Sequence, residues 1–372
     1  MKILFVTTIS NTINSFLIPH IQLLLEQGHQ VDLACNIVSE INPLLIKLGC
    51  KVNPIAFQRS PLSKENYRAY KNLKKLIKRE GYQIIHTHTP VASVCVRLAC
   101  RNLENIRIIY TAHGFHFYNG APYRNWLLYY PIERYLSRFT DVLITINNED
   151  FKRAKKTFKS KRIEYVPGIG LDLMQFSNIK IDKFQKRKDL GLPEDAIVIL
   201  SVGELNINKN HRTVINAIYK LKNPKIYYVI CGDGEQKNNL LSLSKDLGLQ
   251  DNVKLLGYRN DIPEILTIAD IFVFPSLREG LPVSLMEAMA AGLPIVCSNI
   301  RGNKDLVSSY KGGFLINPTN TDEVAKYIDL LIKDKEKFHD LSPQNKEIIK
   351  KFDLSTVITR MQEIYTAVLR ND

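Results

Sequence analysis

The sequence predicts an α/β protein made of two doubly wound parallel-sheet domains. Short apolar runs alternate with amphipathic stretches of helical length, which is typical of parallel sheets covered by helices on both faces. The alternation occurs twice, and the second series begins after the Gly-Leu-Pro-Glu segment at 191–194. A length of 372 residues fits two domains of ordinary size.

Apolar runs of strand length define the expected strands, and longer amphipathic stretches define the helices. In the first series we expect strands at 2–7, 30–35, 52–56, 83–87, 107–112, 141–146 and 162–166. Helices are expected near 14–27, 64–80, 91–102, 123–138 and 148–157.

The second series predicts strands near 196–202, 226–231, 253–256, 271–274, 294–297 and 313–316. Its helices are expected near 209–222, 235–247, 261–268, 282–291 and 321–333, and residues 354–370 have a helical pattern. Residues 173–190 are polar and rich in Lys and Asp, so we interpret them as an interdomain linker. The expected domains are therefore residues 1–180 and 185–352.

Positive charge is concentrated in the first half of the chain. Residues 1–180 hold 25 Lys and Arg against 12 Asp and Glu, whereas the remainder hold 26 against 25. This asymmetry favours an anionic partner for the first half. We found no signature of a nucleic-acid-binding fold, so a membrane surface is the preferred partner and nucleic acid is not expected. The alternative is that the charge only aids solubility.

The six cysteines form no C-x-x-C pair, and two of them end strand-like runs, which suits a reducing compartment. The opening M-K-I-L-F-V indicates a first strand, not a signal peptide, and no apolar run is long enough to span a bilayer. No D-x-D motif is present, and two histidines at 86 and 88 lack an evident third metal ligand. We therefore expect neither a metal nor another cofactor.

Two glutamates eight residues apart, Glu279 and Glu287, are the most informative pair in the chain. Glu279 falls in the loop after an expected strand, and Glu287 falls inside the following helix. Backbone N–H groups from Gly280, Leu281, Pro282 and Val283, proline excepted, would project from that helix N-terminus, which attracts phosphate. Flanking carboxylates suit sugar hydroxyls, so the layout fits a nucleotide-sugar.

This segment resembles the E-x7-E motif of the retaining GT-B glycosyltransferases of family 4. Other segments agree with that family in order and spacing: T-A-H-G-F-H-F at 111–117, S-V-G-E-L at 201–205, K-N-H at 209–211, C-G-D-G-E at 231–235, L-G-Y-R at 256–259 and A-D at 269–270. The likeness runs from Met1 to about residue 350 and is nearest to bacterial enzymes that build capsule, exopolysaccharide or other lipid-linked glycans. It implies two Rossmann-like domains facing a central cleft, with the C-terminal helix 354–372 crossing back to the first.

The resemblance also implies roles for individual residues. Glu279 would bind hydroxyls of the transferred sugar, and Glu287 would accept from both ribose hydroxyls of the nucleoside. Backbone groups near Tyr258 and Arg259 would contact the base. His113 would lie over the donor sugar, although His116 is an alternative to it.

Lys209 would begin a helix and place a positive charge at the diphosphate. Family members usually carry Arg five residues before this lysine, where this chain has Glu204. Glu204 would face a sugar hydroxyl or pair with Lys209. The alternative for Lys209 is a solvated helix residue, and for Glu287 an exposed one.

The resulting expectation is a retaining, metal-independent glycosyltransferase. It would move a hexose or N-acetylhexosamine from a UDP-sugar to a polyprenyl-diphosphate-linked acceptor, at the cytoplasmic face of the membrane. Helix 64–80, with its many lysines and a stripe of Tyr67, Tyr70, Leu73 and Ile77, is either an anionic-lipid contact or an ordinary surface helix. Phe115, Phe117, Tyr118 and Trp126 are candidate aromatic contacts near the acceptor.

Two other functions are compatible with the sequence. A UDP-sugar 2-epimerase shares the expected fold and would act without an acceptor. A non-catalytic basic protein would bind polyanions or membranes in a salt-sensitive way and have no affinity for UDP. A dehydrogenase is disfavoured because no G-x-G-x-x-G follows the first strand.

Overall fold

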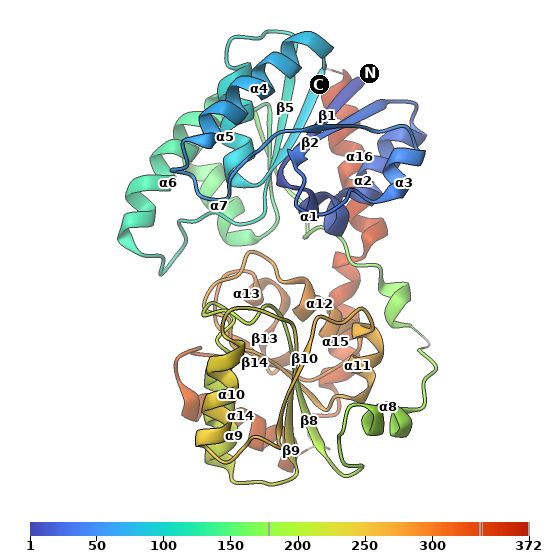
Figure 1. Cartoon of the computed structure of the whole chain (residues 1–372), viewed down its shortest axis with the longest axis vertical. Coiled ribbons are helices and arrows are strands. Elements are labelled where there is room, and N and C mark those ends of the chain that lie inside the picture. The colour runs from blue at the N-terminus through green and yellow to red at the C-terminus, as the bar shows by residue number, and fades with distance from the viewer. Residues whose placement is uncertain (178, 335, 337, 371–372) are drawn as a thin grey trace. The chain divides into compact units, whose positions relative to one another are not determined.

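The computed structural model describes residues 1–177, 179–334, 336 and 338–370, and the chain divides into two compact units (Figure 1). The first comprises Met1–Gly170 and the C-terminal segment from Ser355, and the second comprises Leu171–Leu354. The division falls earlier than the expected boundary at 180. Leu171 belongs to the second unit because its N–H donates to the carbonyl of Phe352 at 2.9 Å and its carbonyl accepts from Leu354 at 2.9 Å.

The first unit contains a seven-stranded sheet in the order β3-β2-β1-β4-β5-β6-β7, and all its pairings are parallel. Each strand overlaps the run predicted for it. The strands are β1 (Lys2–Ile9), β2 (Gln30–Asn36), β3 (Lys51–Pro54), β4 (Ile84–His88), β5 (Arg107–Ala112), β6 (Val142–Thr145) and β7 (Arg162–Tyr165).

Helices cover both faces of this sheet. They are α1 (Ser10–Thr12), α2 (Ile18–Glu26), α3 (Pro43–Lys47), α4 (Glu65–Glu80), α5 (Pro90–Cys100), α6 (Tyr123–Leu136), α7 (Asn148–Thr157) and α16 (Leu354–Arg370), with a π-helical turn at Ile13–Leu17 and a 3-10 turn at Ser137–Phe139. The expected helix 14–27 is therefore interrupted by the π-helical turn. The short α3 was not expected, because five residues between turns carry too little periodic signal.

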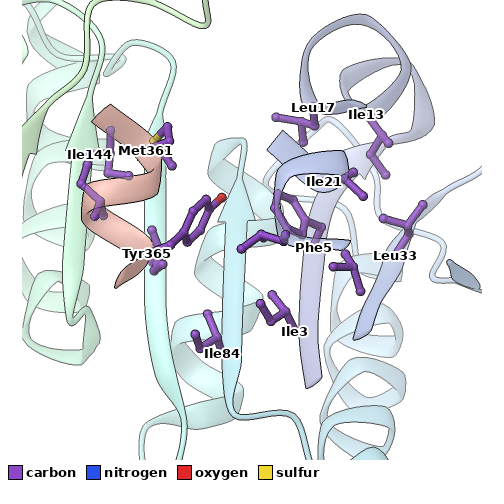
Figure 2. Close-up of a cluster of buried hydrophobic side chains, with 14 of the residues drawn as sticks. Ile3, Phe5, Ile13, Leu17, Ile21, Leu33, Ile84, Ile144, Met361 and Tyr365 are labelled. Atoms are coloured by element: carbon purple, nitrogen blue, oxygen red, sulfur yellow. The ribbon is translucent and has the colours of Figure 1, made fainter. Parts of the chain in front are cut away.

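Helix α16 packs into the core of the first unit. Figure 2 shows Met361 and Tyr365 projecting from α16 toward the sheet, among Phe5, Ile84 and Ile144, and all five are almost fully buried. The Tyr365 hydroxyl also lies 2.7 Å from His86 Nδ1 in β4. The last helix is thus joined to residues from the start of the chain by apolar burial and a buried hydrogen bond.

The second unit contains another seven-stranded sheet, ordered β10-β9-β8-β11-β12-β14-β13. Its strands are β8 (Ile197–Val202), β9 (Ile226–Cys231), β10 (Val253–Gly257), β11 (Ile271–Phe274), β12 (Ile295–Ser298), β13 (Ser308–Ser309) and β14 (Gly312–Ile316). Its helices are α8 (Lys183–Asp189), α9 (His211–Leu221), α10 (Lys237–Asp246), α11 (Ile262–Ile268), α12 (Val283–Ala290), α13 (Asn303–Leu306), α14 (Thr321–Lys333) and α15 (Leu341–Ile349), with 3-10 turns at Leu173–Phe176 and Lys350–Phe352.

The linker prediction for residues 173–190 was wrong for its second half. Helix α8 packs on α11, where Lys186 forms ion pairs with Asp261 (2.7 Å) and Glu264, and Arg187 pairs with Asp270 at 3.3 Å. A segment rich in lysine resembles a solvated linker by composition. Here its cations are matched by acids on the neighbouring elements of the same unit, and residue 178 lies outside the described residues.

Among the described residues, no helix is both long enough and apolar enough to cross a bilayer.

The packing of α16 predicts a stability effect confined to the first unit. Met361→Ala should lower the free energy of unfolding by about 2–5 kcal/mol, because it removes a buried side chain and leaves a cavity. Gln362→Ala, at the exposed neighbouring position, is the matched control and should change it by less than about 0.5 kcal/mol. Guanidinium unfolding followed by the fluorescence of Trp126, the only tryptophan, reports on this unit. Equal effects of the two substitutions would contradict the packing described.

Candidate functional site

Two loops at the carboxyl ends of β8 and β11 are joined in the second unit. The Lys209 ammonium lies 2.8 Å from Glu279 Oε1, and both side chains are largely buried. The backbone carbonyl of Asn208 accepts from the Leu277 N–H at 2.8 Å, and its side-chain amide donates to the carbonyl of Arg278 at 3.0 Å. The residue predicted to bind the diphosphate and the residue predicted to bind the transferred sugar are therefore direct neighbours.

The Lys209 ammonium contacts an aromatic ring as well as the Glu279 carboxylate. It lies 4.6 Å from the centre of the Phe274 ring, which adds a cation–π contact to the ion pair. Lys209 precedes α9 rather than beginning it, because Asn210 takes a left-handed conformation (φ 55°) that delays the helix to His211. Its side chain therefore extends from a loop and remains in contact with the end of the sheet.

Glycines allow these loops to approach one another closely. A Cβ on Gly232 would lie 1.9 Å from the carbonyl oxygen of Gly203, and one on Gly302 would lie 2.2 Å from that of Gly280. Both glycines also have positive φ, 152° and 80°. Any side chain there would force apart the loops that follow β8, β9, β11 and β12.

Glu204 does not pair with Lys209. It is exposed, and its Oε2 accepts from Asn206 Nδ2 at 2.9 Å, while Asn206 Oδ1 accepts from the Lys209 backbone N–H at 2.9 Å. That part of the prediction for Glu204 was wrong, because Glu279 is the carboxylate next to the ammonium. The other expectation, that Glu204 faces a sugar hydroxyl, stays a prediction.

Helix α12 begins at Val283, with Pro282 as the residue before its first turn. The first N–H groups of an α-helix lack intrahelical acceptors, so this end offers free donors beside Glu279. Leu281 and Pro282 are buried, whereas Gly280 and Val283 are partly accessible. These four residues connect the ion pair to the helix that carries Glu287.

Glu287 is a partly buried carboxyl group in the first two turns of α12. Burial raises its pKa to about 7, well above the ordinary value for glutamate. Among the described residues, its side chain has no hydrogen-bond or ion-pair partner. The group is therefore neither an ordinary solvated helix residue nor a member of the ion pair, and a hydroxyl-bearing ligand would supply the donors it lacks.

Tyr258 and Arg259 follow β10, whose last residue Gly257 accepts a hydrogen bond from the Gly232 N–H at 2.8 Å. Tyr258 is 81% exposed. The Arg259 guanidinium is engaged by Asp261, and this contact holds the pKa of the Asp261 carboxyl well below its usual range. The hydrogen bond of Gly257 fixes the start of this loop next to Gly232. That backbone groups of the loop contact the base stays a prediction.

In the first unit, His113 belongs to a cluster of four histidines. His113 Nε2 lies 3.1 Å from His88 Nδ1, and His86 Nε2 lies 2.8 Å from Thr111 Oγ1. These three and His20 line a cavity of about 20 Å³, which is enough for one water molecule. Among the described residues, buried ring nitrogens of His20 and His88 lack a hydrogen-bond partner, so polar atoms occur in the neighbourhood of a cavity whose lining is mostly apolar.

Burial keeps the four rings neutral. It lowers the pKa values of His20 and His113 to about 4, and those of His86 and His88 well below 6.5. Within the described part of the chain, no three His, Cys, Asp or Glu side chains are grouped as metal ligands. The cluster can therefore donate and accept hydrogen bonds as neutral imidazoles at physiological pH.

The loop that carries His113 is fixed by a buried carboxylate in α7. Asp150 accepts from the Phe115 backbone N–H at 3.0 Å and from Asn147 Nδ2 at 2.9 Å. Phe115 and Phe117 are buried, 4.9 Å apart between ring centres, so the prediction that they contact an acceptor was wrong. Two aromatic residues alternating with histidine look like a surface motif, but the alternation places both rings in the core.

Comparison with known proteins supports the architecture. A family model described as "Glycosyl transferases group 1" matches residues 182–348, and one described as "Glycosyl transferase 4-like" matches residues 2–147. A Bacillus subtilis (strain 168) protein, provisionally named glycosyltransferase EpsD, is 34% identical over 100% of this chain and 98% of its own length. The chain is a family 4 glycosyltransferase.

Two further proteins are similar to this glycosyltransferase. The Escherichia coli protein named UDP-Gal:alpha-D-GlcNAc-diphosphoundecaprenol alpha-1,3-galactosyltransferase is 33% identical, with 81% of this chain and 79% of that protein covered. The crystal structure of Anabaena HepE in complex with UDP and glucose superimposes with a TM-score of 0.82 at 20% identity, covering 99% of this chain and 100% of that one. The GT-B fold, predicted from the sequence, is thereby confirmed.

Sequence reasoning missed two residues that position the loops of this glycosyltransferase. Arg301 is buried after β12, and its Nε donates to the Glu279 carbonyl at 3.1 Å. Asn210 donates its side-chain amide to the carbonyls of Pro275 (3.2 Å) and Pro318 (2.7 Å). Both residues follow predicted strands at the carboxyl end of the sheet, and this position could have identified them from the sequence.

Helix α4 has two distinct faces in the glycosyltransferase. Leu73 and Ile77 of the predicted apolar stripe are buried in the core, while Tyr67 is 62% exposed. Lys71 lies 4.6 Å from the Tyr67 ring centre, and most of the other cations of the helix are exposed. Most of the stripe therefore packs in the core, and only Tyr67, in the first turn of the helix, is an exposed aromatic residue.

The neutral histidines predict an acid-sensitive first unit. Their pKa values are lower in the folded than in the unfolded chain, so their contribution is present above pH 6.5 and is lost as the pH falls toward 4. Each buried histidine then lowers the free energy of unfolding by about 1.4 kcal/mol for each pH unit in this range. Unfolding monitored by Trp126 at pH 7.5 and pH 5 should show this loss. His88→Gln should reduce the slope, whereas His339→Gln, at an exposed position, should not; an unchanged slope in His88→Gln would contradict the account.

Proposed function

We propose that this glycosyltransferase moves a hexose or N-acetylhexosamine from a UDP-sugar to a lipid-linked saccharide, with retention of anomeric configuration. The supporting observation is the Lys209–Glu279 pair beside the N-terminus of α12. A cation, free backbone donors and a carboxylate within one group of loops match the diphosphate and sugar of such a donor.

The donor would lie along the loops of the second unit. Lys209 and the N–H groups at Gly280–Val283 would bind the diphosphate, and Glu279 would bind sugar hydroxyls while remaining next to Lys209. Glu287 would accept from the two ribose hydroxyls. Backbone groups at Tyr258 and Arg259 would contact the base, Glu204 would face a sugar hydroxyl, and His113 would act at the transferred sugar as a neutral imidazole.

The proposed reaction is a front-side displacement. The acceptor oxygen bonds to the anomeric carbon on the face from which the diphosphate departs, as the bond between that carbon and the diphosphate oxygen breaks. The acceptor proton passes to the departing diphosphate. Lys209 and the helix dipole stabilise the developing negative charge, so we propose that transfer needs neither a resident metal nor another cofactor.

The lipid-linked acceptor is supported by the name of the similar Escherichia coli protein and by the charge of the first half of the chain. We propose a polyprenyl-diphosphate-linked saccharide of capsule or exopolysaccharide synthesis. The basic surface would then hold the protein peripherally at the cytoplasmic face of an anionic membrane, each basic residue contributing roughly 1 kcal/mol. Nucleic acid is not proposed as a partner.

Removal of either member of the ion pair should reduce transfer strongly and leave the fold intact. Lys209→Ala removes charge at the leaving group, and Glu279→Ala removes hydroxyl contacts, so each should lower kcat/KM by about 10²-fold or more. Lys220→Ala and Asp322→Ala, which break an exposed ion pair in the same unit, are matched controls. The assay is mass spectrometry of lipid-linked product from a panel of nucleotide-sugars. Wild-type turnover in both site variants would refute the assignment, and release of free sugar without acceptor would indicate an epimerase or hydrolase.

Glu287 predicts that UDP binding depends on pH. Ribose hydroxyls donate to the ionised carboxylate, so binding should lower a pKa that is about 7 in the free protein and release a proton. Affinity should fall about tenfold from pH 8 to pH 6. Calorimetry in buffers of different ionisation enthalpy measures both effects. Glu287→Gln should remove the dependence that exceeds the titration of UDP itself; the same pH profile in wild type and variant would exclude a ribose contact.

A further inference from the structure

In the first unit, helix α5 contacts both α4 and α6 (Figure 1). An apolar pocket of about 180 Å³ is lined by residues of all three helices and of the segment before α4. Its apolar lining comes from Leu62, Val91, Val94, Leu128, Tyr129 and Ile132. No residue of the pocket belongs to the histidine cluster or to the loops of the second unit.

The side-chain amide of Asn66 and the carboxylate of Glu133, which line this pocket, already have partners. Asn66 donates to the carbonyl of Ser60 at 2.8 Å and accepts from the Gln58 N–H at 2.8 Å. Glu133 is buried and lies 2.8 Å from the guanidinium of Arg97. A polar ligand would compete with these bonds, whereas an apolar ligand would leave them intact.

The outer face of α6 continues the apolar character of the pocket. Its exposed side chains include Tyr123, Leu127, Leu128, Ile132 and Tyr135. The charged residues exposed on this helix are arginines, at 124 and 134, and the next exposed charge along the chain is Arg138. Glu133, the one acid of α6, is buried in its ion pair. Apolar and cationic side chains without exposed acid on the helix complement an apolar chain with an anionic headgroup.

The pocket lies beside the carboxyl end of the sheet. Pro90 and Val91 follow His88 at the end of β4 and begin α5. Tyr129 lines the pocket and stacks on the His116 ring at 4.6 Å between ring centres, and His116 lies in the loop that carries His113. A ligand in the pocket would therefore have one end next to this loop.

We propose that this pocket binds the isoprenoid chain of the lipid-linked acceptor, close to its diphosphate. The proposal rests on the proposed function. A single apolar chain can enter a pocket whose amide and carboxylate are already paired, and the exposed arginines of α6 complement the phosphate charge. The pocket thereby selects an acceptor by its lipid, separately from the recognition of the acceptor sugar.

Binding of short lipid probes tests this proposal. Calorimetry with the full chain should show affinity for farnesyl diphosphate that exceeds its affinity for inorganic diphosphate. Val94→Trp fills the pocket, and Ile132→Glu places a charge at it; each should weaken farnesyl diphosphate binding by about tenfold or more. Val38→Trp, at an exposed position outside the pocket, is the matched control and should bind as wild type. Undiminished binding in both pocket variants would overturn the proposal.

Transfer assays separate this inference from the proposed function. With undecaprenyl-diphosphate-linked GlcNAc as the probe acceptor, the pocket variants should raise KM for the acceptor and leave UDP affinity unchanged. A phenyl diphosphate analogue of the same sugar should be used equally by wild type and variants. If the variants lose adsorption to phosphatidylglycerol vesicles but keep farnesyl diphosphate binding, the face docks on a bilayer and the pocket proposal is wrong. If wild type uses no lipid-linked saccharide, the proposed function fails, and farnesyl diphosphate binding still decides the chemistry of the pocket.

Discussion

Parallel strands place the loops that follow them at one edge of the sheet, and every candidate residue of this glycosyltransferase depends on that constraint. In the second unit the constraint brings Lys209 and Glu279, seventy positions apart, to 2.8 Å. The loops can meet because Gly232 and Gly302 leave no Cβ where backbone atoms of neighbouring loops lie. Arg301 then fixes the Glu279 carbonyl from the adjacent strand end. The site is thus a product of sheet topology, and its side chains are positioned by backbone contacts that only small residues permit.

The two units differ in the charge of the groups at the carboxyl edges of their sheets. In the second unit a cation and a carboxylate are paired, while burial raises the pKa of a further carboxyl group, Glu287, to about 7. In the first unit four histidines are held neutral around a small cavity, and the positive charge lies elsewhere on exposed elements such as α4. The pairing means that neither largely buried charge is left isolated in the protein alone. A neutral imidazole can lie near a sugar without adding charge.

The sequence was sufficient for the sheet class and for every named strand except the two-residue β13, because buried apolar runs bounded by turn residues are strong local signals. It also identified Glu279 and Lys209, because both follow strands and match a spaced motif. It did not reveal that they pair with each other, since Glu204, five positions before Lys209, was the nearer carboxylate in sequence. The histidine cluster escaped prediction because His20 comes from a different helix and meets His86, His88 and His113 only through the fold. The packing of α8 could not be predicted, because a helix whose lysines form ion pairs has the same amino-acid composition as a solvated linker.

The central claim is that the loops of the second unit bind a nucleoside diphosphate. Hydrogen–deuterium exchange of the whole protein, with and without UDP, tests it most directly. We predict slower amide exchange at 203–209, at 257–261 and at 279–287, and unchanged exchange at 247–252, the turn that leads into the amino end of β10 in the same unit. Saturating UDP that leaves the exchange of all three segments unchanged would contradict the account.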